Sequence, residues 1–203
     1  MGKREEKKQR TRKHIRQTAK ILFIKQGFQS TTIDDIVQSV GIARGTFYLY
    51  YEDKISLFTE LLQEMYQPIV DILQRTLSDL ESTNATSISH QIRYLQTAIE
   101  LAQFIEVNKS TLPLHFQEIW SAGEHGLAMR QWRSDIEHLA QGLIDSSIQQ
   151  EIIRPVPSKM TAMAIVAAAE RVIWGWQNGE LESQRQELAQ EMALLFWAGI
   201  APQ

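Results

Sequence analysis

Apolar residues recur along this chain at intervals of three and four positions, the spacing that places them on one face of an α-helix. In residues 11–26 these positions are Ile15, Ala19, Leu22 and Phe23. Gly27 follows, where a residue with positive φ commonly ends a helix. The sequence has no sustained alternation with a period of two, which a half-buried β-strand would need. The pattern therefore predicts an all-α protein.

The same reasoning assigns the remaining helices. We expect them at residues 33–39, 44–50, 54–80, 88–108, 112–122, 126–151, 158–178 and 182–198. Pro68 lies inside the long helix, where its missing N–H predicts a kink or a helix end at Gln67. The stretch at 82–89, rich in Ser, Thr and Asn, is the clearest loop.

Two short helices near the N-terminus are separated by a glycine turn. Thr32 is placed to cap the first of them, and Asp35 lies in its first turn, where the helix dipole favours an acid. Gly41 marks the turn, and Asp53 is placed to cap the long helix that follows. This arrangement is typical of a helix-turn-helix, whose second helix enters the major groove of DNA. The alternative is an ordinary helical hairpin within a bundle.

The second short helix has an unusual surface. Within seven positions it carries small residues and polar residues with hydrogen-bond donors: Arg44, Gly45, Thr46, Tyr48 and Tyr50. Phe47 and Tyr51, four positions apart, are the expected inward anchors. A helical glycine costs about 1 kcal/mol relative to alanine. That cost is tolerable where the backbone must approach another molecule closely.

Charge is divided unevenly along the chain. The net charge is −3, but residues 1–60 carry 12 Lys and Arg against 7 Asp and Glu, whereas the remainder is acidic. A basic half points to a polyanionic partner such as nucleic acid. Residues 1–10 are expected to be a flexible basic arm. This arm either reaches the minor groove or the DNA backbone, or is only a solvated tail.

Residues 11–62 resemble the DNA-binding domain of the tetracycline-repressor (TetR) family. The matching segments are ILFIKQGF at 21–28, TTIDDIV at 31–37, VGIARGTFYLYYEDK at 40–54 and SLFTELL at 56–62. The resemblance implies an N-terminal helix-turn-helix domain of three helices at 11–55, which helix 54–80 links to the rest. It also implies a helical ligand-binding and dimerisation domain over 56–203.

The resemblance also implies roles for single residues. Tyr48 and Lys54 match the family's phosphate-contacting tyrosine and lysine, and Thr31 and Thr32 would offer hydroxyls and a helix N-terminus to the same strand. The residues expected to read bases are Arg44, Thr46 and Tyr50, with a contact to phosphate as the alternative for Arg44. Two departures from the family pattern are Ala43, which cannot cap the recognition helix, and Leu49, which stands where an aromatic residue or histidine is frequent.

A dimer and an effector follow from the same comparison. Proteins of this type place two recognition helices about 34–36 Å apart on a palindrome. We expect a homodimer through helices 158–178 and 182–198, the first rich in alanine and the second carrying an apolar stripe. A small-molecule ligand would release the DNA. The candidate lining residues, for each of which core packing is the alternative, are Phe104, His115, Phe116, Trp120, Met129 and Trp132.

Other classes of protein fit less well. The chain has no cysteine, no secretory signal and no apolar run near the ~20 residues of a membrane span. We therefore expect a cytoplasmic regulator, without enzymatic activity, cofactor or metal. The alternatives are a helical-bundle metal enzyme or carrier and a DNA-bound adaptor that acts on a protein partner. The first would use carboxylate–histidine pairs at i, i+3, such as His115 with Glu118 and Asp135 with His138.

Overall fold

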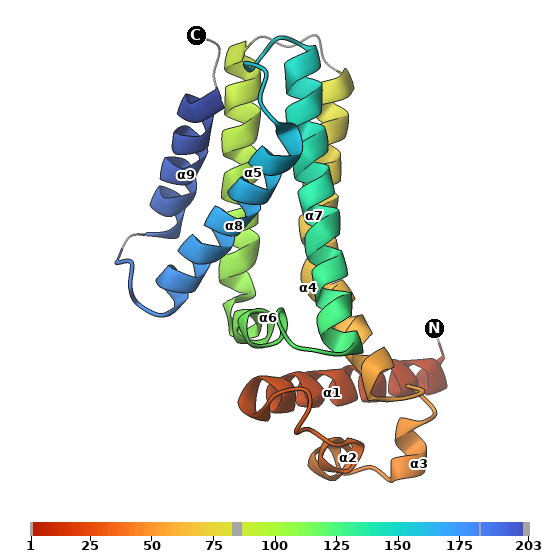
Figure 1. Ribbon diagram of the computed structural model, residues 1–203. Helices are drawn as coiled ribbons and strands as arrows, with labels where there is room; N and C mark the ends of the chain where they lie inside the picture. The colour runs from red at the N-terminus through yellow and green to blue at the C-terminus, as the bar shows by residue number, and fades with distance from the viewer. Residues whose placement is uncertain (1, 83–86, 183, 201–203) are drawn as a thin grey trace. The chain divides into compact units, whose positions relative to one another are not determined.

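The computed structural model describes residues 2–82, 87–182 and 184–200, and all regular structure within these ranges is helical (Figure 1). The helices are α1 (Lys3–Gln26), α2 (Ile33–Val40), α3 (Arg44–Phe47), α4 (Lys54–Ser82), α5 (Ser87–Val107), α6 (Leu112–Glu118), α7 (Glu124–Gln149), α8 (Ser158–Gln177) and α9 (Arg185–Ile200). A 3₁₀ turn at Lys109–Thr111 precedes α6. The all-α prediction is confirmed. The loop expected at 82–89 falls partly outside the described residues, and α5 begins at Ser87.

The chain forms two compact units, and neither is continuous in sequence. The first consists of residues 1–65 and 110–130, and the second of residues 66–109 and 131–203. Both α4 and α7 therefore contribute residues to each unit. Whereas the sequence suggested a DNA-binding domain at 11–55, the compact unit that holds these residues also takes in α6 and the start of α7.

The expected flexible arm at residues 1–10 is helical from Lys3 onward and forms the first turns of α1. Lys, Arg, Glu and Gln dominate this segment, and all four have high helix propensity. Glu5 and Glu6 lie in the first turn, where they interact favourably with the helix dipole. The structure thus shows helix from Lys3 onward in this segment, while the flexibility of residues 1–10 stays a prediction.

The first of the two short helices, α2, has the predicted caps. Thr32 and Asp35 form a reciprocal capping box, in which the Thr32 hydroxyl accepts from Asp35 N–H and the Asp35 carboxylate accepts from Thr32 N–H. Gly41 ends α2 in the left-handed conformation, with φ +76°. α3 spans only Arg44–Phe47, and turns replace the helix expected through Tyr50. Ala43 provides no side-chain cap to α3, as its methyl group predicts.

Aromatic rings form the core of the first unit. Phe23 at the end of α1 packs against Phe28 and Phe58, with ring centroids 5.3 and 5.6 Å apart, and Phe28 and Phe58 are 4.7 Å apart. Phe47 and Tyr51 are also buried, as the sequence predicted. Burying a ring of this size stabilises a fold by roughly 1.5–3 kcal/mol. These rings therefore fix α1 and α4 together and hold α3 by its inner side.

The second unit is a helical bundle in which α9 runs along α5 (Figure 1). Leu73, Leu80 and Leu143 form one buried cluster, and a second contains Ile144, Ile152, Ile153 and Ala162. α4 continues through Pro68, so the alternative of a helix end at Gln67 was wrong. Within the described residues, the apolar stretches of the helices fall short of what a membrane crossing requires.

Candidate nucleic-acid interface

α3 and the turn after it present a polar outer surface. Phe47 is completely buried, while Arg44, Gly45 and Tyr48 are exposed. Thr46 and Tyr50 are half-buried, and Leu49 is 75% exposed. Because Phe47 points into the core, the other side chains of α3 and of the following turn face outward. All five polar or small positions predicted to face DNA on this segment remain at least partly accessible.

Arg44 is held by neighbouring polar groups. Its Nη1 lies 2.6 and 2.7 Å from the two carboxylate oxygens of Asp34, and its Nη2 lies 3.4 Å from the Tyr48 hydroxyl. These hydrogen bonds, to Tyr48 and to Asp34, raise the pKa of Arg44 above its ordinary value. Exposed ion pairs are weak, because water solvates both partners, so a base edge or phosphate can compete with Asp34 for the guanidinium.

Gly45 has open space around it. A Cβ atom built at this position meets no other atom within 4 Å, and the backbone φ lies outside the left-handed region. Neither internal packing nor backbone conformation therefore requires a glycine here. The open space and the ordinary φ are both consistent with a glycine that is needed because a bound molecule approaches the backbone at position 45.

The structure does not place Thr31 on the proposed DNA surface. Thr31 is completely buried, and its hydroxyl donates to Gly27 O at 2.8 Å. This expectation was wrong because the hydroxyl is needed inside the turn that follows α1. Thr32 is exposed, but its hydroxyl belongs to the capping box of α2.

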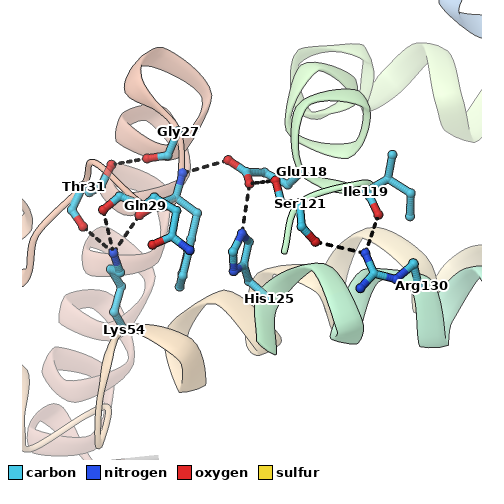
Figure 2. A network of polar contacts seen from close by, with 10 residues as sticks. Gly27, Gln29, Thr31, Lys54, Glu118, Ile119, Ser121, His125 and Arg130 are labelled. Carbon is cyan, nitrogen blue, oxygen red and sulfur yellow. Dashed lines mark hydrogen bonds and ion pairs between the residues drawn. The ribbon is translucent and has the colours of Figure 1, made fainter. Parts of the chain in front are cut away.

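Lys54 makes contacts that the sequence did not predict. Its ammonium donates to the carbonyl oxygens of Phe28 and Thr31 at 2.7 Å each, and a longer contact of 3.4 Å reaches Gln29 O (Figure 2). Nζ also lies 4.3 Å from the centroid of the Phe28 ring. Burial lowers the pKa of Lys54, while Glu118 and Asp35 partly offset that effect. Lys54 thus binds the loop between α1 and α2 in the DNA-free protein, and its contact with phosphate stays a prediction.

The basic residues of α1 divide between two faces. On one face, Arg12 donates to Glu60 at 2.7 and 3.1 Å, and Arg16 pairs with Glu60 and Glu64 on α4. Burial tends to raise the pKa of Glu60, but the hydrogen bonds from Arg12 and Arg16 outweigh it and lower the pKa. These arginines therefore serve to join α1 to α4.

The other face of α1 is basic and exposed. A depression of about 390 Å³ lies beside it and is lined by Arg10, Thr11, Lys13, His14, Gln17, Val40 and Ile42. Val40 and Ile42 flank the Gly41 turn, so this basic face adjoins the helix-turn-helix. Its charge is suited to a phosphate backbone.

Sequence reasoning missed the role of Glu118. Its buried carboxylate accepts from Phe28 N–H at 2.8 Å and from the Ser121 hydroxyl at 2.8 Å (Figure 2). His125 Nε2 lies 3.2 Å from Glu118 Oε2, and the His125 ring stacks on Phe28 at 4.4 Å. The suggested metal pairing of His115 with Glu118 therefore gives way to internal hydrogen bonds. No local pattern could have signalled this contact, because it joins residues 90 positions apart.

The six candidate ligand-lining residues do not share one compact unit. Phe104 and Trp132 belong to the second unit, whereas His115, Phe116, Trp120 and Met129 belong to the first. Met129 is completely buried and Trp120 is 72% exposed. Trp132 stacks on Tyr66 with ring centroids 5.8 Å apart, and burial raises the pKa of Tyr66 well above its ordinary range.

The candidate dimerisation helices expose apolar side chains. On α8 these are Met160, Met163 and Trp174, and on α9 they are Leu194 and Leu195. Met160, Met163, Ala164 and Ala167 follow the spacing of one helix face, and all four are exposed. Ala162, on a different face of α8, is buried in the second unit's own core.

Comparison with known proteins agrees with this geometry. Residues 15–61 match the family model of bacterial regulatory proteins of the tetR family. The chain is 27% identical over 105 residues to the Staphylococcus epidermidis negative transcriptional regulator IcaR of the biofilm operon icaADBC. It is 39% identical over 59 residues to the Shigella flexneri transcriptional regulator AcrR. These matches cover 48% and 29% of this chain, and the chain spans only 57% and 27% of the two relatives' lengths.

The solved structure of SmeT extends the likeness to most of the chain. SmeT is the repressor of the Stenotrophomonas maltophilia multidrug efflux pump SmeDEF. It superposes with a TM-score of 0.72 at 17% identity, and the match covers 94% of this chain and 90% of SmeT. At this identity the likeness establishes the fold.

Proposed function

Because this chain belongs to the tetR family of bacterial regulatory proteins, we propose that it is a sequence-specific DNA-binding transcriptional regulator. The observation that carries the proposal is the outer surface of α3. There a glycine with open space around it lies among exposed polar side chains, and Phe47 anchors the opposite side. A helix held in this way can meet the major groove with its backbone as well as its side chains.

The proposed contacts fall into two classes. Arg44, Thr46 and Tyr50 read base edges, with Gly45 allowing close approach of the backbone. Tyr48 and the exposed basic face of α1 bind phosphates, which fix the register but carry no sequence information. Arg44 leaves its exposed pair with Asp34 when it binds.

The regulator acts as a homodimer in this proposal. A single α3 of four residues offers little surface, and two copies about 34–36 Å apart would read successive major grooves of a palindrome. The exposed apolar residues of α8 and α9 supply a self-complementary face for a two-fold interface. Such an interface would bury Met160, Met163 and Leu195 against the partner.

We expect the protein to act as a repressor that leaves its DNA site when a small molecule binds. IcaR is a negative regulator and SmeT is a repressor, and SmeT also forms a complex with triclosan. A ligand that favours a dimer with altered spacing between recognition helices must weaken operator binding, because the two equilibria are linked. Trp132 and Phe104 in the second unit are our candidates for contact with such a ligand. Since the target is chromosomal DNA, the site of action is the cytoplasm.

Sequence selection tests the proposal directly. The purified full-length protein is incubated with a pool of random duplex DNA, and bound duplexes are amplified and sequenced over several rounds. Recovery of a short palindrome supports a dimeric, sequence-specific regulator. Recovery of no common sequence, at a salt concentration where nonspecific binding is weak, would refute it.

A further inference from the structure

We propose that Glu118 is a positioning residue for DNA binding, an inference that rests on the function proposed above. Glu118 lies 57 positions beyond the last residue of the matched DNA-binding family model. Its carboxylate nevertheless belongs to the same compact unit as α1, α2 and α3. The argument concerns one loop, residues 27–32, which we call the α1–α2 loop.

Four side chains supply hydrogen-bond partners to backbone groups of the α1–α2 loop. The Thr31 hydroxyl satisfies Gly27 O, and Asp35 binds Thr32 N–H. Lys54 binds the carbonyl oxygens of Phe28 and Thr31. The remaining partner is Glu118, which accepts from Phe28 N–H. Three of these partners lie within residues 31–54 of the matched domain, so Glu118 is the contribution from outside it.

Phe28 is the point at which these contacts meet. Its N–H donates to Glu118, its carbonyl accepts from Lys54, and its ring contacts both His125 and Lys54. The residue is 6% exposed, so water cannot readily replace a lost partner. Losing Glu118 would leave a buried N–H unsatisfied, and the loop would move to solvate it.

Movement of the α1–α2 loop would reach the DNA-binding surface. The loop ends at Thr32, which caps α2, and α2 leads through the Gly41 turn into α3. The loop carbonyls also hold the first residue of α4 through Lys54. Both ends of the segment that carries α3 therefore depend on the α1–α2 loop, to which Glu118 is bound through Phe28 N–H.

The segment between α6 and α7 is built to hold this carboxylate in place. Arg130 Nη1 donates to Ile119 O and Ser121 O at 3.1 and 3.0 Å, and the Ser121 hydroxyl donates to Glu118. Gly126 allows the close packing, since a Cβ there would lie 1.9 Å from Ser121 O. α7 then continues covalently into the second unit.

The test compares Glu118→Ala with Glu118→Gln in the full-length protein. Alanine removes the acceptor for Phe28 N–H, whereas the glutamine amide oxygen can still accept that hydrogen bond. Glu124→Gln is the matched control, because Glu124 is exposed and lies six residues away on α7. Two quantities are measured below the unfolding temperature of each variant. One is amide hydrogen exchange in residues 28–32 of the free protein, and the other is affinity for the palindrome recovered by selection.

For Glu118→Ala we expect exchange in residues 28–32 to accelerate and the dissociation constant to rise by about tenfold or more. The slope of affinity against salt should not change, since no phosphate contact is lost. Glu118→Gln should stay within about threefold of the wild type, and Glu124→Gln should match it. A merely structural role would lower the unfolding temperature without changing the affinity of the folded protein.

Three results would overturn the proposal. They are wild-type exchange in folded Glu118→Ala, wild-type DNA affinity in that variant, or equal damage from Glu118→Gln and Glu118→Ala. If Glu118→Ala does not fold, Glu118→Asp replaces it, because the shorter side chain keeps the charge but withdraws the acceptor from Phe28. Failure of the proposed function looks different, since the wild-type protein itself would then select no DNA sequence.

Discussion

Replacing Gly45 with alanine separates the stability of the free protein from its affinity for DNA. The new methyl group meets no atom within 4 Å, and the backbone φ at this position is outside the left-handed region. Alanine also restricts the unfolded chain more than glycine does. Gly45→Ala should therefore raise the free energy of unfolding by about 0.5–1 kcal/mol.

The same methyl group should weaken DNA binding. If the α3 backbone lies against a base edge or a phosphate, the methyl forces the two apart, as overpacking does in a protein core. Overpacking costs about 1–3 kcal/mol, which corresponds to roughly 5–150-fold in affinity for each recognition helix. A dimer would experience this cost at both half-sites.

Two measurements check Gly45→Ala. Urea unfolding followed by far-ultraviolet circular dichroism gives the stability, and fluorescence anisotropy with a labelled palindrome gives the affinity. A scrambled duplex of equal length is the control for nonspecific binding. A more stable protein with unchanged operator affinity would show that the α3 backbone does not approach DNA. A less stable protein would show that the space around Gly45 is not open.

The remaining predictions concern single contacts. Thr46→Ala should change which bases are preferred at one position of the selected palindrome, with little change in stability. Lys54→Met should lower the free energy of unfolding by roughly 1.5–3 kcal/mol, because buried carbonyls of the α1–α2 loop lose a charged donor; wild-type stability in urea would contradict this. Thr32→Ala should cost about 1 kcal/mol by removing the α2 cap, measured in the same way. The pKa of Glu60 is lower in the folded protein than in the unfolded chain. The Glu60 carboxylate therefore stabilises the folded protein above the ordinary carboxyl pKa of about 4.3, and this stabilisation is lost as the pH falls through the folded-state pKa. Glu60→Gln should therefore reduce stability at pH 7 and flatten its decline in acid, and an unchanged pH profile of urea unfolding would refute this.

Local sequence signals determined the secondary structure around the candidate site. Thr32 and Asp35 lie three residues apart, Gly41 takes a left-handed conformation, and Phe47 and Tyr51 share one helix face. The capping box and the glycine turn depend on neighbours within four positions, and the spacing of Phe47 and Tyr51 shows which helix face is apolar. Spacing therefore predicted two short helices and a glycine turn but left an ordinary helical hairpin as the alternative, and the resemblance of residues 11–62 to the TetR family favoured the helix-turn-helix.

Lengths of elements were less well determined. α1 extends to Lys3 because helix propensity prevails over charge repulsion, and α3 ends at Phe47 although the polar pattern continued to Tyr50. Helix ends depend on small differences in free energy between a last helical turn and an alternative turn. Tertiary packing of Phe47 and Tyr51 decides between them here.

Only the tertiary structure decided which side chains meet across long stretches of sequence. It buried Thr31, directed the Lys54 ammonium to backbone carbonyls, and brought Glu118 to Phe28 across 90 positions. Hydrophobic periodicity shows which face of a helix is buried, but it carries no information about which distant element covers that face. The choice of partner for a buried polar group depends on the complete set of donors and acceptors that the folded chain brings together, and that set exists only once the helices have packed.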